Sequence, residues 1–139
     1  MNAQEIVQFA RELRNVYKTT DSYKLAEIYG IRIIERKACK DFKAHTLKLK
    51  GYPTIIAVNE RYTEVSKKVL CAHELGHALL HNEFINYFDI TQKNIHKQTE
   101  YEANLFAVAL LCDDKQFAIP VCEMSNAMLK SVLDCNIQM

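Results

Sequence analysis

The sequence has few of the residues that mark unusual protein classes. It contains no tryptophan, 3 glycines and 2 prolines among 139 residues, which excludes collagen-like and low-complexity chains. No apolar run approaches the ~20 residues that a bilayer crossing needs, and the chain starts as an amphipathic helix rather than a signal peptide. With 49% hydrophobic and 25% charged residues, the composition is that of a globular protein. We therefore expect a single domain over residues 1–139 with no membrane partner.

Charge and cysteine content narrow the class further. The net charge is +1, so no excess of positive charge indicates a nucleic-acid partner. The 5 cysteines are odd in number and include no C-x-x-C pair, which argues against a disulfide framework and against a cysteine-rich zinc ribbon. Scattered free thiols are typical of a reducing compartment. The sequence therefore predicts a cytoplasmic protein that does not bind nucleic acid directly.

Hydrophobic periodicity predicts helices and strands in the first half of the chain. Apolar residues at helical spacing predict a helix over 3–17 and a shorter one over 22–29, closed by a glycine. Runs rich in β-branched residues predict strands at 31–35, 45–50 and 54–58. Because the connections are short, we expect these strands to form a three-stranded antiparallel sheet.

The second half of the chain is predicted to be helical. Thr63 is a candidate N-cap for a helix that runs to His81. Residues 82–97 carry little periodicity and are predicted to be largely loop, and two further helices are predicted over 98–112 and 123–134. Strands followed by helices indicate one α+β domain.

A five-residue motif inside the helix that follows Thr63 carries the chemistry. It reads His73-Glu74-Leu75-Gly76-His77, the pattern H-E-x-x-H. Side chains four positions apart lie about 40° apart around an α-helix, so His73 and His77 can share one tetrahedral zinc ion. Glu74 would lie beside the ion rather than on it, where its carboxylate can act as general base and then as general acid. We therefore expect a catalytic zinc site on this helix.

A catalytic zinc ion takes three protein ligands, so the motif needs a third. The metzincin pattern would require Gly at position 80 and His at position 83, and this chain has neither. We favour Glu100, because Asn104 shares its helix face and could accept a hydrogen bond from a ligand histidine. Glu-x-x-x-Asn is the arrangement of a gluzincin, with Asn in place of the usual Asp. His96 is the alternative third ligand.

Other residues near the motif have roles that the sequence leaves open. His81 either caps the helix, where a partly charged histidine favours the negative end of the dipole, or borders the cleft. Glu102 points about 200° away from Glu100 around its helix and is expected to be solvated. The hydrolase would also need a donor for the oxyanion. The candidates for this donor are Tyr52, Tyr87, Tyr101 and His96.

Two segments carry a family resemblance. Residues 69–81 read V-L-C-A-H-E-L-G-H-A-L-L-H, and residues 100–107 read E-Y-E-A-N-L-F-A. In this order the two segments resemble the ImmA/IrrE metallo-endopeptidase family, whose second motif is E-x-x-A-N-x-F-A. The resemblance extends over roughly residues 20–112. Beyond it, Cys112-Asp113-Asp114 stands where the family usually has a proline, so the role of residues 112–139 stays open.

The resemblance implies a fold, a site and a partner. It implies a zincin-like fold with a small sheet beside the active-site helix. It also implies zinc on His73, His77 and Glu100, with Glu74 as general base and acid. Family members are common in phages and mobile elements, where some cleave a neighbouring helix-turn-helix repressor. A transcriptional repressor is therefore the expected protein substrate.

Individual residues distinguish an endopeptidase from a non-cleaving regulator and from a DNA-binding protein. The leading hypothesis is a zinc-dependent endopeptidase that hydrolyses a peptide bond in a phage or mobile-element repressor. The alternative is a protein that keeps the zinc scaffold and regulates its partner by binding without cleavage. The intact Glu74 favours the enzyme, because a scaffold needs no general base. A DNA-binding regulator is disfavoured, because a strand rather than a basic recognition helix follows the 22–29 helix.

Overall fold

Most helices of the described residues lie close to where the sequence predicts them, and four of them begin at a capping side chain. The structure is a computed structural model that describes residues 1–81 and 93–139. The side chains of Asn2, Asp21, Thr63 and Ser125 each accept a backbone hydrogen bond at the start of a helix, as N-cap residues do. The predicted helices over 3–17, 22–29 and 63–81 are therefore confirmed to within one or two residues. The α-helices are α1 (Ala3–Tyr17), α2 (Ser22–Ile28), α3 (Glu64–Leu80), α4 (Lys93–Leu111) and α5 (Asn126–Asp134), with 3-10 turns at Asp114–Gln116 and Val121–Glu123.

The helix α4 begins earlier than the sequence predicts. Residues 82–92 lie outside the described residues, but residues 93–97 of the predicted loop are helical, so that part of the prediction is wrong. Periodicity reports only the part of a helix that packs against a core, and the exposed first turns of α4 carry polar residues such as Lys97 and Gln98. This extension places His96 on the same helix as Glu100.

The three strands form a mixed sheet rather than the predicted antiparallel one. The strands are β1 (Arg32–Arg36), β2 (Ala44–Leu47) and β3 (Ile55–Asn59), in the order β1-β3-β2. β2 pairs with β3 in antiparallel fashion, as expected, whereas β1 is parallel to β3. The reason lies in burial: Ile56 and Val58 of β3 are fully buried, so the most apolar strand takes the centre and separates its two predecessors. The α+β class and the three strands are confirmed.

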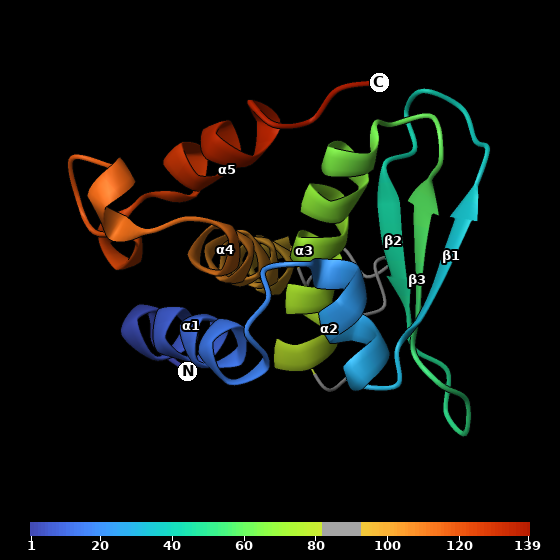
Figure 1. Ribbon diagram of the computed structural model, residues 1–139, viewed down its shortest axis with the longest axis horizontal. Coiled ribbons are helices and arrows are strands. Elements are labelled where there is room, and N and C mark those ends of the chain that lie inside the picture. Colours follow the sequence, from blue (N-terminus) through green and yellow to red (C-terminus); the bar gives the residue numbers. More distant parts are fainter. Residues whose placement is uncertain (82–92) are drawn as a thin grey trace.

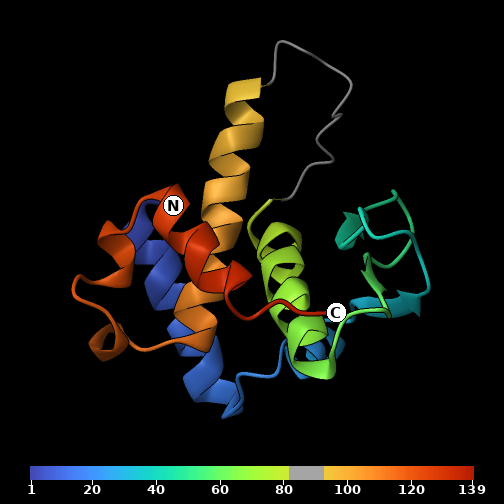
Figure 2. The ribbon, with the colours of Figure 1, turned by 90° about the horizontal axis from the view of Figure 1, so that it is seen from above.

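The helix α3 lies between the sheet and α4. Figures 1 and 2 show it beside β2 and β3 on one side and α4 on the other, and α3 contacts all three elements. A Cβ atom built on Gly76 would lie 3.0 Å from the Cα of Ala103, so the absence of a side chain lets α3 and α4 approach closely. None of the helices that the structure describes is both long and apolar enough to cross a bilayer. The close crossing brings the motif of α3 to Glu100 of α4.

Candidate metal centre

The H-E-x-x-H motif occupies the buried middle of α3. The rings of His73 and His77 meet edge to face, with centroids 4.8 Å apart and planes at 85°. The ligand atoms of His73, Glu74 and His77 all lie within 4.8 Å of one another. Glu74 and His77 are buried, and His73 is partly buried. The spacing of the motif therefore gathers these three side chains at one point on the helix.

The fourth member of this cluster is Glu100, which reaches both histidines from α4. Its Oε1 lies 2.8 Å from His77 Nε2, and its Oε2 lies 3.3 Å from His73 Nε2. Ligand atoms bound tetrahedrally to one zinc ion stand about 3.3 Å apart, so the separation from His73 fits a shared ion, and the 2.8 Å separation from His77 is that of a hydrogen bond. Glu74 is a weaker ligand candidate, because its Oε2 lies 3.7 Å from His73 Nε2. Glu100 therefore contacts both histidines of the motif, whereas Glu74 approaches His73 at a longer distance.

His96, the alternative ligand, lies one turn before Glu100 on α4. It lines a cleft of about 380 Å³ together with His73, Glu74, His77 and Glu100. The extension of α4 thus places both candidates on the same helix face, at i and i+4. Glu100 is the one with short contacts to both histidines of the motif, and this geometry favours it as the third ligand.

The charges of the cluster support one another. Burial alone would raise the pKa of the Glu100 carboxyl, but the hydrogen bonds and positive charge of His73 and His77 outweigh burial and hold this pKa well below its ordinary value. Burial alone would lower the pKa of His73, yet the Glu100 hydrogen bond and the carboxylates of Glu74 and Glu100 leave it raised. Glu100 is therefore ionised at neutral pH, which is the form that binds a cation.

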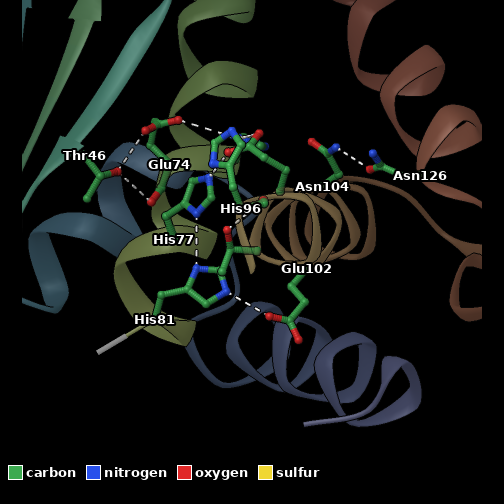
Figure 3. A network of polar contacts seen from close by, with 11 residues as sticks. Thr46, Glu74, His77, His81, His96, Glu102, Asn104 and Asn126 are labelled. Atoms are coloured by element: carbon green, nitrogen blue, oxygen red, sulfur yellow. Dashed lines mark hydrogen bonds and ion pairs between the residues drawn. The ribbon is translucent and has the colours of Figure 1, made fainter. Parts of the chain in front are cut away.

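Glu74 is held by a residue that the sequence reasoning missed. Thr46 of β2 donates its hydroxyl hydrogen to the Glu74 side chain at 2.9 Å, and the same oxygen lies 3.1 Å from the Glu74 carbonyl (Figure 3). Glu74 Oε2 is left facing His73. The alternation of β2 puts Thr46 and Leu47 on opposite faces, so a half-buried threonine on this strand was the available signal. Thr46 fixes where the carboxylate points.

Asn104 connects the cluster to the C-terminal helix. Its side chain contributes to raising the pKa of the His73 ring; the hydrogen bond from a histidine of the motif to Asn104 stays a prediction. Its Nδ2 donates to Asn126 Oδ1 of α5 at 2.8 Å. Asn126 therefore fixes the orientation of the Asn104 amide, and with it the oxygen that is left for His73.

His81 and Glu102 form a second layer behind His77. His81 is the C-cap residue of α3, with extended backbone angles (φ −115°, ψ 100°). Its ring turns back toward α4, so that Nδ1 lies 3.1 Å from His77 Nδ1 and Nε2 lies 3.0 Å from Glu102 Oε1 (Figure 3). The expectation that Glu102 is solvated is wrong, because its side chain is only 18% exposed. The backbone bend at His81 is what brings the two together.

The contacts of His81 constrain which of its own ring nitrogens carries a hydrogen. A carboxylate only accepts, so neutral His81 carries its hydrogen on Nε2, toward Glu102, and accepts on Nδ1 from His77. Neutral His77 then has its lone pair on Nε2, which faces Glu100 Oε1 at 2.8 Å. Two acceptors at that distance need a proton or a metal ion between them. The chain from Glu102 through His81 therefore favours the form of His77 that binds a metal through Nε2.

The predicted oxyanion donors are scattered. Tyr52 lies between β2 and β3 and is 72% exposed, whereas Tyr101 is half-buried on α4, and neither lines the cleft of the motif. Tyr87 lies outside the described residues. His96 alone of the four candidates lines the cleft, among the residues that the structure describes. Its position makes it the remaining candidate for this role.

Comparisons with known proteins agree with this geometry. The profile of a peptidase family, described as the IrrE N-terminal-like domain, matches residues 26–121. An "uncharacterized immunity region protein 2" of Bacillus phage phi105 is 31% identical over 100 residues, which cover 70% of this chain and 62% of that relative. No solved structure matches the chain at a comparable level of significance. On the strength of the profile match, the chain belongs to the ImmA/IrrE family of IrrE N-terminal-like peptidase domains.

Proposed function

We propose that this chain is a zinc-dependent endopeptidase that hydrolyses a peptide bond in a protein partner. The observation that carries the proposal is the placement of Glu74. Its Oε2 lies 3.7 Å from His73 Nε2, farther than Glu100 lies from either histidine, and Thr46 holds its Oε1. A carboxylate in that position is what a hydrolytic site needs and what a purely structural metal site lacks.

The family implies a divalent metal ion, and the residues present fit one. We propose that His73, His77 and Glu100 hold it and that it is zinc, because two imidazoles and one carboxylate form a common catalytic zinc site. When bound, the ion supplies Lewis-acid polarisation of the scissile carbonyl and acidifies a water molecule. Asn104 and the pair of His81 and Glu102 would orient the two imidazoles.

Glu74 performs the proton transfers in this proposal. Its Oε2 accepts a proton from the attacking water and passes that proton to the nitrogen of the leaving amine. Thr46 limits the movement of the carboxylate, because its hydroxyl donates its hydrogen to Glu74 Oε1 at 2.9 Å. Thr46 also lies on β2, an edge strand, and an extended peptide can pair with such an edge. A substrate strand on β2 would run alongside Glu74.

The partner is proposed from the phage relative. The printed name of that relative assigns it to the immunity region of Bacillus phage phi105. We extend this setting to the present chain and propose that its substrate is a phage or mobile-element helix-turn-helix repressor. Cleavage of such a repressor would relieve the repression that maintains immunity.

The test separates metal binding from cleavage. In purified full-length protein, Glu74→Gln should keep stoichiometric zinc and lose at least ~100-fold in cleavage rate, because only the general base is removed. His77→Ala should lose zinc as well. Glu27→Gln is the matched control, because Glu27 is exposed on α2 and lines no part of the cleft. The assay incubates each protein with the repressor encoded beside its gene and separates the products by mass.

Two outcomes would contradict the proposal. If zinc-loaded Glu74→Gln protein cleaves at the wild-type rate, Glu74 is not the base. If the wild-type protein binds zinc and the repressor and cleaves nothing, the non-cleaving regulator is the correct function.

A further inference from the structure

A second cleft opens beside the candidate metal centre and leads away from Glu74. It has a volume of about 390 Å³, within the range of ligand-binding pockets, about 300–1,000 Å³. His73, Glu100 and His96 line both this cleft and the one that contains Glu74. The two clefts therefore adjoin at the proposed metal ligands, and a peptide bound at the centre would reach into both.

Residues outside the family match build the far wall of this second cleft. The family profile ends at residue 121, whereas α5 and the residues after it supply Asn126, Lys130, Leu133, Asp134 and Ile137 to the lining. Figure 2 shows α5 and the C-terminal segment lying along α4 and α3. The wall is thus a feature of this chain in addition to the shared peptidase domain.

Hydrogen bonds to the start of α3 hold this wall in place. Thr63 N donates to Gln138 O at 2.9 Å, Ser66 Oγ donates to Asn136 O at 3.1 Å, and Gln138 N donates to Ser66 Oγ at 2.6 Å. Ser66 is 1% exposed, so these bonds are shielded from water. The segment that carries Ile137 is therefore fixed on the same helix that carries the motif.

The lining combines an apolar floor with a basic rim. Val69 and Leu70 of α3 and Leu133 of α5 are each less than 9% exposed, and Ile137 is half-buried beside them. Three exposed lysines, Lys43, Lys97 and Lys130, surround the opening. Asp134 also lines the cleft. Among the described residues, none of the three lysines forms an ion pair with a carboxylate, so their charge is available to a ligand.

We propose that this second cleft is a specificity pocket for the substrate of the proposed peptidase. Its occupant is a peptide segment in which a large apolar side chain adjoins an acidic residue close to the scissile bond. The apolar side chain would pack on Leu70, Leu133 and Ile137, and the carboxylate would face Lys97 and Lys130. The position of the scissile bond rests on the proposed function, whereas the chemistry of the occupant rests on the residues that line the cleft.

The test uses one probe, a mixture of synthetic decapeptides with randomised residues. Zinc-loaded Glu74→Gln protein is immobilised and the bound peptides are sequenced, which reads selection without cleavage. Wild-type protein digests the same mixture, and mass spectrometry reads the residues around each cut. Both profiles should show an apolar residue next to Asp or Glu.

Variants assign the preference to the cleft. Lys97→Glu/Lys130→Glu should lower the selection for acidic residues by about 2- to 25-fold, since each exposed ion pair contributes up to about 5-fold. Ile137→Ala should shift the apolar preference toward smaller or other side chains. The matched control is Lys24→Glu/Lys115→Glu, which changes the net charge equally at exposed sites away from the cleft. The control should leave both profiles unchanged.

The outcomes separate this inference from the proposed function. If wild-type protein cuts peptides without the apolar and acidic pair, or if the lysine reversal leaves the profile unchanged, the specificity pocket is overturned and the peptidase stands. If the Glu74→Gln protein selects the pair but wild-type protein cuts nothing, the pocket stands and the peptidase activity is wrong.

Discussion

Replacement of His81 by phenylalanine tests the proposed orientation of His77. Phenylalanine fills the space of the imidazole but offers no acceptor to His77 Nδ1. Without metal, His77 can place its hydrogen on Nε2 and donate it to Glu100, so the loss costs little. With metal on Nε2, the hydrogen must sit on Nδ1, where the mostly buried ring of His77 has no partner. The penalty therefore falls on the metal-bound state.

The size of the effect follows from that asymmetry. A buried donor without a partner costs about 1–3 kcal/mol, which corresponds to a fall in zinc affinity of about 5- to 150-fold. Losses of about 10- to 100-fold are common when an outer partner of a metal-bound histidine is removed. His81→Gln should lose less than about 5-fold, because an amide can accept from His77 and donate to Glu102. In His81→Phe, Glu102 loses its hydrogen-bond partner in the metal-free and in the zinc-bound protein alike, so this loss does not change the zinc affinity.

Zinc affinity is measured by competition with a chromophoric chelator at fixed pH. Chemical unfolding in the presence of EDTA checks that each variant folds. A His81→Phe protein that folds and binds zinc as tightly as the wild type would refute the tautomer argument. Equal losses in His81→Phe and His81→Gln would show that packing, and not hydrogen bonding, is what matters at this position.

Three further predictions concern the framework of the site. Asn59 is fully buried and donates to carbonyls of the 38–42 loop, so Asn59→Asp should lower the free energy of unfolding by about 3 kcal/mol or more; a loss below about 1 kcal/mol in urea titrations would contradict this. Gly76→Ala should cost about 1–3 kcal/mol and also weaken zinc binding, because its Cβ would meet the backbone of α4; an unchanged melting temperature in EDTA would count against the close crossing. The hydrogen bond from Arg11 lowers the pKa of Asp114 below its ordinary value of 3.8. The stability that this pair contributes is therefore present at neutral pH and is lost as pH falls through the lowered pKa, so the difference between wild type and Asp114→Asn should shrink in acid, and a constant difference down to about pH 2 would contradict the shift.

The sequence predicts those features that depend on residues close together in the chain. The H-E-x-x-H geometry follows from helix periodicity alone, so the gathering of His73, Glu74 and His77 was predictable. The helix starts were predictable because capping residues act within three positions of the start. The approach of Glu100 was predicted from its spacing to Asn104, and the structure brings it to both histidines.

The remaining features depend on contacts between distant segments. The order β1-β3-β2 follows from which strand is buried most, and periodicity within one strand carries no information on its neighbours. Thr46 reaches Glu74 from 28 positions away, and Glu102 reaches His81 from 21 positions away. A helical wheel placed Glu102 opposite Glu100 and hence in solvent. It could not show that α3 ends in an extended residue whose ring covers that side of α4.

The position of Asn104 links the shared and the added parts of the chain. His96, Glu100 and Asn104 follow at intervals of four on one face of α4; all three line the second cleft, and His96 and Glu100 also line the cleft of the motif. Within that face the Nδ2 of Asn104 donates to Asn126, and its side chain contributes to raising the pKa of His73. Asn126 begins α5, which lies beyond the family match. The helix that we propose to select the substrate thus also holds the amide that we expect to orient a proposed metal ligand. A change in α5 that improves the fit to a new substrate is therefore constrained to preserve this amide contact.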